Sequence, residues 1–192
     1  MPSSLVLGNV AVCTAPGIFM PGWFDYRGLM DYFHPVFITI STYGTRLHGD
    51  ERGSVNRRGT TLRAHFVAPN QKLERIKRAQ MNQPPMVFDT PQRTCVHHAL
   101  ESFCAYKQWL VLALHVRTNH IHALIYGKTH SQRIVQGIKA AATRALREAG
   151  LIDEARKVWT EGASITTCET DEDIATIRDY IKNRQGNPLP ME

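Results

Sequence analysis

The sequence lacks several features that define common classes of protein. It has no internal repeat and no apolar run of about eighteen residues, the length that a membrane-spanning helix needs. No Lys or Arg precedes its first apolar run, whereas a secretory signal normally carries that charge. Its four cysteines, Cys13, Cys95, Cys104 and Cys168, form no Cys-x-x-Cys pair, which excludes a zinc ribbon and a redox motif. We therefore expect a cytoplasmic protein with reduced thiols.

The composition of the sequence indicates a folded, basic protein. Its 192 residues suit one domain with a core of its own, and an apolar content of 43% argues against disorder throughout. The net charge is +6 and the isoelectric point is about 9.3. A basic chain favours a polyanionic partner, most often nucleic acid.

The spacing of apolar residues predicts a mixed α+β fold. Residues 44–60 contain four glycines and many charges, and we expect a loop there. The order of strands and helices predicts a ferredoxin-like antiparallel sheet, with helices packed on one face and the strand 120–127 in a central position. Ser131 is the expected cap of the helix that it begins. The expected strands are 36–43, 109–116, 120–127 and 163–168, and the expected helices are 70–81, 91–108, 131–150 and 170–188.

Two histidines lie inside the predicted strand 120–127, in the stretch "HIHALIYG". Side chains alternate across a strand, so His120 and His122 share one face and Ile121 points to the other. Two neutral imidazoles on one face can chelate one divalent metal ion, provided that another element supplies a third ligand. The alternative is that one or both are ordinary histidines hydrogen-bonded at the surface of the sheet.

A tyrosine in the last predicted helix completes a recognisable pattern. Tyr180 lies 58 residues after His122, in "IRDYIKNRQG". With "TNHIHALI" and "DYIKNRQG", the sequence resembles the single-tyrosine HUH transposases, which include insertion-sequence and REP-associated tyrosine transposases. The stretches "IKAAATRALREAG" and "KVWTEGASITTCETDEDIATIRDYI" also resemble that family. The resemblance implies an HUH transposase-like domain over residues 35–188, and it leaves an irregular extension over 1–34 and a tail over 189–192.

The resemblance also implies a reaction and its partners. The family carries out DNA transposition as single-stranded DNA endonucleases and strand transferases. Tyr180 would be the nucleophile and would form a 5′-phosphotyrosine intermediate. Mg²⁺ or Mn²⁺ on His120 and His122 would polarise the phosphate. Hairpin-forming single-stranded DNA and a second copy of the chain, in a homodimer, are the implied partners. The alternative is a domesticated, catalytically inactive protein that binds single-stranded DNA or hairpins.

The third metal ligand departs from the family pattern. The family places Gln or Asn four residues after the tyrosine, where this chain has Arg184. Arginine has no lone pair to offer a cation, so Arg184 would instead hold a phosphate. Asn183 lies nearer to the tyrosine around the helix, at about 60°, and Gln185 lies at about 140°. Gln185 matches the Gln-Gly ending of the family subgroup, and a distortion before Gly186 would turn it inward. We expect Gln185 as the third ligand, with Asn183 as the alternative.

Basic side chains supply candidate phosphate contacts. For each of them the alternative is an ordinary solvated surface charge. Trp159 is a candidate for stacking on an unpaired base, and burial in the core is the alternative. A two-histidine phosphoesterase is excluded, because the chain has no second His-x-Thr/Ser motif. The candidate DNA contacts are Arg133, Lys139, Arg144 and Arg184.

Overall fold

The computed structural model describes residues 33–51, 54–56 and 65–185. It confirms the mixed α+β order, and most element bounds lie within two residues of those expected. None of the described helices is both long enough and apolar enough to cross a membrane. The elements are β1 (Val36–Ser41), β2 (Ser54–Asn56), β3 (His65–Val67), α1 (Gln71–Ala79), α2 (Thr90–Tyr106), β4 (Leu110–Val116), β5 (His120–Tyr126), α3 (Ser131–Glu148), β6 (Ser164–Thr167) and α4 (Asp171–Asn183).

Four of the described strands form one antiparallel sheet in the order β4-β5-β1-β6. β1 lies between β5 and β6, although β2, β3, two helices and β4 separate it from β5 in the chain. This crossed order is that of the ferredoxin-like fold, which the sequence predicts. β5 is a central strand, as expected, so the histidines lie in the middle of the sheet.

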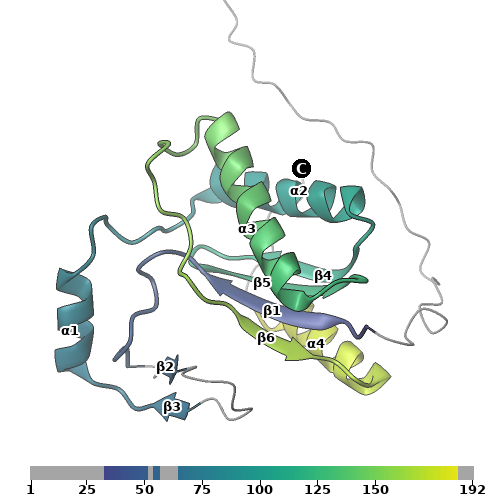
Figure 1. Cartoon of the computed structure of the whole chain (residues 1–192), viewed down its shortest axis with the longest axis horizontal. Coiled ribbons are helices and arrows are strands. Elements are labelled where there is room, and N and C mark those ends of the chain that lie inside the picture. The colour runs from purple at the N-terminus through teal and green to yellow at the C-terminus, as the bar shows by residue number, and fades with distance from the viewer. Residues whose placement is uncertain (1–32, 52–53, 57–64, 186–192) are drawn as a thin grey trace, which may run out of the picture.

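The larger core lies between the sheet and the pair α2 and α3 (Figure 1). β1 contributes Ile38 and Ile40 to this face, and β5 contributes Ile121 and Ile125; all four are almost completely buried. Each such side chain stabilises the fold by roughly 1.5–3 kcal/mol relative to exposure to water. The helices supply the other half of this core: Val96, Leu100, Cys104, Ile134, Ile138, Ala142 and Leu146.

α4 covers the opposite face of the sheet, as Figure 1 shows. A second core joins Ile174 and Ile181 of α4 to Ala113 and Leu124 of the sheet. The expectation that all helices pack on one face is therefore wrong. The reason is visible in β5, where every residue from Ile121 to Tyr126 is buried, so both faces of this strand need a covering layer.

Three local expectations also differ from the structure. β2 pairs with β3 in a separate two-stranded sheet, so residues 54–56 are not loop as expected. Ser131 is the first helical residue of α3 rather than its cap, and the cap position belongs to His130. α4 ends at Asn183 rather than at residue 188. Except for residues 33 and 34, the expected N-terminal extension lies outside the described residues, as does the tail over 189–192.

Candidate functional site

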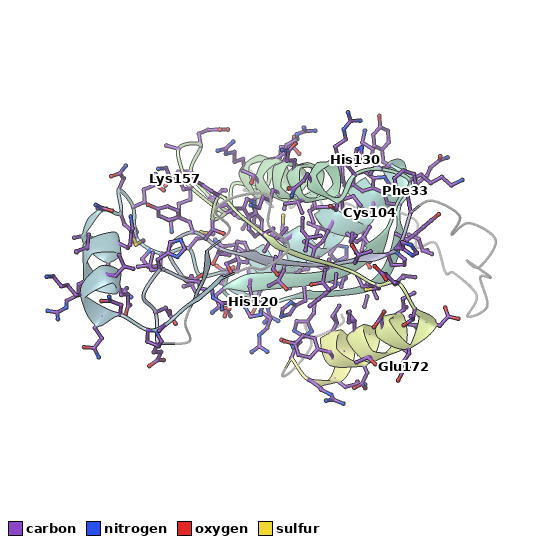
Figure 2. The ribbon with its side chains drawn as sticks, turned by 60° about the horizontal axis from the view of Figure 1, so that its bottom comes forward. Phe33, Cys104, His120, His130, Lys157 and Glu172 are labelled. Carbon is purple, nitrogen blue, oxygen red and sulfur yellow. The ribbon has the colours of Figure 1, made fainter. Side chains whose placement is uncertain are left out.

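His120 and His122 lie on the sheet face that α4 covers, and Figure 2 shows His120 on that side. Ile121 between them is buried in the opposite core, as the alternation predicts. The Nε2 atoms of the two histidines are 3.1 Å apart, and the rings meet edge to face. One ion with metal–nitrogen distances of about 2.1 Å can therefore bind both nitrogens.

Two neighbours orient the imidazole rings through their Nδ1 atoms. His120 Nδ1 lies 2.6 Å from the Asn119 side-chain oxygen, so it donates a hydrogen bond and leaves Nε2 with a lone pair. His122 Nδ1 lies 2.9 Å from the hydroxyl of Thr39, its partner across β1 and β5. A hydroxyl can donate or accept, so Thr39 supports either tautomer of His122. Such outer contacts fix the orientation of metal-binding histidines.

The buried position of His122 keeps its ring neutral. Only 6% of His122 is exposed, and its pKa is lowered to about 4, with burial as the largest cause. The positive charges of His120, His115 and Arg117 contribute to this lowering of the pKa, and a hydrogen bond with Gln185 partly opposes them. Because metal ions bind the neutral imidazole, His122 is in its ligand form at neutral pH.

Tyr180 lies on α4 with its ring against His122. Their ring centroids are 5.5 Å apart, and Phe37 of β1 contacts both rings. Tyr180 is 39% exposed, so a substrate can reach it from solvent. A capping box of Thr170 and Asp173 defines the start of α4. The structure thus brings together a tyrosine and two histidines that are far apart in the chain.

The residues after Tyr180 divide into two groups. Gln185 is buried and its side chain hydrogen-bonds His122. Asn183 and Arg184 are exposed and both bind Asp179, at 2.7 Å and 3.0 Å. These hydrogen bonds, from Asn183 first and then Arg184, lower the pKa of the Asp179 carboxyl. α4 stops at Asn183, and the non-helical backbone of Arg184 (φ −115°, ψ 12°) leads to Gln185.

The donor set that gathers here is two imidazoles and one amide. No group of three His, Cys, Asp or Glu side chains suited to a metal occurs among the described residues. The amide of Gln185 is the further polar side chain that contacts His122. Carbonyl oxygens suit Mg²⁺ and Mn²⁺, and imidazole suits transition ions. Because these three donors are uncharged, they would not neutralise a cation. The full positive charge of the ion would then act on a bound phosphate. These residues fit a weakly held divalent cation that retains water ligands.

Three of the four expected DNA contacts lie on α3, on the other side of the sheet from the histidines. Arg133 and Arg144 are exposed there. The Lys139 ammonium instead donates to the carbonyl oxygens of Thr160, at 2.7 Å, and Gly162, at 2.9 Å. Burial lowers the pKa of Lys139. Lys139 therefore holds the loop that leads to β6.

Trp159 packs into the larger core beside Phe88. Its indole N–H lies 2.9 Å from the Thr143 hydroxyl and 3.1 Å from the Lys139 carbonyl oxygen. A partly buried ring with its polar atom satisfied has a structural role. Trp159 therefore lies in the core, which was the alternative to stacking on an unpaired base.

Sequence reasoning missed two residues of β4 and its turn. His115 faces His122 across the two strands, and Arg117 faces His120. His115 is buried and hydrogen-bonds the backbone of Ile181, the residue after Tyr180. Burial, followed by the charge of Arg117, lowers the pKa of His115. The three-residue turn between β4 and β5 carried the signal, because it sets a register in which these four residues share a face.

The fold and site define a class: a ferredoxin-like domain with paired histidines on a central strand and a tyrosine helix beside them. The family model described as "Transposase IS200 like" matches residues 80–184. That range is more than half of the chain, and the protein belongs to this family. No curated protein matches the chain.

The solved structures that are similar to this chain include two transposases. A REP-associated tyrosine transposase bound to a REP hairpin is 15% identical, with a TM-score of 0.45. The match covers 77% of this chain and 64% of that one, so the chain spans less than two thirds of that transposase. A candidate transposase from Deinococcus radiodurans R1 is 13% identical, with a TM-score of 0.44 and coverage of 86% and 95%. At these identities the family assignment rests on the family model.

Proposed function

We propose that this transposase-family protein cuts and rejoins single-stranded DNA through a covalent bond between Tyr180 and a 5′ phosphate. One observation carries the proposal. Tyr180, His122 and Gln185 meet in a single chain, with the tyrosine ring on the imidazole and the amide bonded to it. Tyrosine is a nucleophile, and the two side chains beside it are ligands for a cation that stabilises phosphate charge.

The proposed reaction exchanges one phosphodiester for another. The Tyr180 hydroxyl oxygen bonds to phosphorus while the bond from phosphorus to the 3′ oxygen breaks. The tyrosine proton leaves, and the departing strand gains a proton to become a 3′-OH. Reversal of these steps with another 3′-OH joins strands without ATP. A free tyrosine has a pKa near 10, so the site must favour loss of that proton. Phe37 and His122 orient the ring by edge-to-face contacts.

His120, His122 and Gln185 would hold Mg²⁺ or Mn²⁺ in this proposal. The ion would supply a Lewis acid for the phosphate oxygens and a fixed orientation for the scissile bond. Asn119 and Thr39 keep both imidazoles turned toward one point through their Nδ1 contacts. The low pKa of His122 keeps that ring available as a ligand at neutral pH.

Hairpin-forming single-stranded DNA is the proposed substrate. A related transposase is known in complex with a REP hairpin, and the positive charge of this chain suits a polyanion. The homodimer implied by the resemblance remains a prediction. One chain brings its own tyrosine to its own histidines, so a dimer is not needed to complete the site. Light scattering with and without DNA measures the oligomeric state, and a monomer in both conditions contradicts the dimer.

A covalent adduct tests the proposal directly. The wild-type protein, Mn²⁺ and a labelled single strand that folds into a hairpin, taken from the DNA flanking the gene, should give a shifted band on a denaturing gel. Tyr180→Phe keeps the ring packing, and it should bind the strand without forming the adduct. Tyr106→Phe is the matched control, because Tyr106 is an exposed tyrosine at the end of α2. An adduct with Tyr180→Phe refutes the assignment.

The second candidate function is DNA binding without catalysis. It is favoured by Arg184 at the position where the family has Gln or Asn. Binding by the wild-type protein, with no adduct in either Mn²⁺ or Mg²⁺, would establish this alternative. Equal or tighter binding to a long perfect duplex would exclude the preference for single-stranded hairpins.

A further inference from the structure

We propose that Arg117 binds a phosphate of the DNA strand in this site; the inference rests on the proposed function. Arg117 directly follows β4, and its backbone N–H donates to the His120 carbonyl oxygen at 2.8 Å. It lies two residues after His115, which faces His122 across the sheet. Alternation therefore puts Arg117 on the same face as both histidines.

Electrostatic effects agree with this placement. After burial and the charge of His120 and His115, the charge of Arg117 also lowers the pKa of His122. For His115, Arg117 is the largest influence after burial. Since such effects fall with distance, the guanidinium lies near the candidate site. It also lies near Arg93, whose pKa is lowered by burial and then by Arg117, and whose Nε donates to the Val116 carbonyl oxygen.

The guanidinium of Arg117 has no acidic partner in the described part of the chain. Three other arginines do pair: Arg78 with Glu74, Arg147 with Glu154, and Arg184 with Asp179. A half-buried guanidinium beside a second one is unfavourable until an anion arrives. Arg184, the arginine expected to hold a phosphate, already has its anion.

Phosphate is the anion that fits this position. A guanidinium presents its N–H groups as a planar fork that can bind two phosphate oxygens at once. Arg117 lies beside the histidines on which the proposed reaction places a phosphodiester. It would hold the strand while Tyr180 attacks, either at the scissile phosphate or at its neighbour.

The first test removes the charge of Arg117. Arg117→Gln should slow adduct formation by at least about tenfold, the usual effect of losing a hydrogen bond to a charged group. Arg117→Lys should recover part of the rate, because it keeps the charge and loses the fork. Lys107→Gln is the matched control: it removes one positive charge at the other end of β4, where Lys107 caps α2. Thermal unfolding checks that all three variants are folded.

Salt dependence tests the contact without relying on catalysis. In a Tyr180→Phe background, Arg117→Gln should weaken binding of the labelled strand and reduce the slope of log K against log salt by about 0.7. Lys107→Gln should leave the slope unchanged. If the wild-type protein forms no adduct, the proposed cleavage fails, and this slope still decides whether Arg117 binds phosphate.

Neutral linkages identify the phosphate. Strands with one methylphosphonate, placed in turn at and around the cleavage site, remove one negative charge each. At the phosphate that Arg117 binds, a neutral linkage should lower the affinity of the wild-type protein for the strand. The same linkage should not lower the affinity of the Arg117→Gln variant any further. The proposal is overturned if the ratio of the two proteins' affinities is the same for every linkage position and Arg117→Gln leaves the salt slope unchanged.

Discussion

Acidification of the metal-free protein should weaken the fold through His122. The pKa of this imidazole is about 4 in the folded protein and 6.5 in the reference state, and burial is the main cause. The unfolded chain therefore takes up a proton at a higher pH than the folded protein does. The stability that depends on neutral His122 is complete above pH 6.5 and is lost as the pH falls toward 4.

The size of this loss follows from the two pKa values. Between pH 7 and pH 5 the difference in proton binding corresponds to about 2 kcal/mol of unfolding free energy, and the limit below pH 4 is about 3 kcal/mol. Urea denaturation at a series of pH values, with a chelator present, measures it. The range from pH 7 to pH 5 lies above the titration of most carboxylates, so His122 and His115 dominate the slope.

Two variants make the assay specific. His122→Gln removes the titrating group and should flatten the dependence between pH 7 and pH 5 by about 2 kcal/mol. His130→Gln, which replaces an exposed histidine at the start of α3, is the matched control variant. Equal pH dependence in wild type and His122→Gln would show that burial does not lower the pKa of His122, and would contradict a neutral ligand form that burial maintains.

Three further outcomes are expected. His120→Ala combined with His122→Ala should bind the strand but form no adduct, and excess Mn²⁺ should not restore the adduct on the gel. Arg184→Gln should leave adduct formation unchanged, because Arg184 is exposed and pairs with Asp179. Gln185→Ala should reduce adduct formation at limiting Mn²⁺. The reverse result would exchange the roles assigned to residues 184 and 185. His115→Leu deprives the Ile181 carbonyl oxygen of its donor and should cost about 1 kcal/mol in urea denaturation, which an unchanged midpoint would contradict.

The elements near the site were predictable because their signals are local. Alternation in the strand places His120 and His122 on one face, and the caps of the tyrosine helix mark its start. The third-ligand position was open, because a regular helix places Arg184 nearest to Tyr180, Asn183 at about 60° and Gln185 at about 140°. The helix stops at Asn183, where Asn183 and Arg184 both bond to Asp179, and the chain then carries Gln185 to His122. Such an ending depends on contacts that periodicity does not report.

Residues that surround the histidines were not predictable, because they depend on strand register. Thr39 reaches His122 only because β1 pairs with β5 in one particular alignment. His115 and Arg117 reach the site through the register of the β4–β5 hairpin. A shift of one residue would turn each of these side chains to the opposite face. The α3 arginines were proposed from charge alone, and charge carries no information about which face a helix covers.

Burial of β5 explains why the tyrosine lies beside the histidines. Leu124 follows His122 on the same face, and an apolar side chain in the centre of a sheet needs a covering layer. Ile174 and Ile181 of α4 supply that layer, and Tyr180 precedes Ile181 in the chain. Apolar packing therefore positions α4, and contact between Tyr180 and His122 is its consequence. Because apolar packing and not the tyrosine hydroxyl positions α4, removal of that hydroxyl should abolish the proposed chemistry and leave the fold intact.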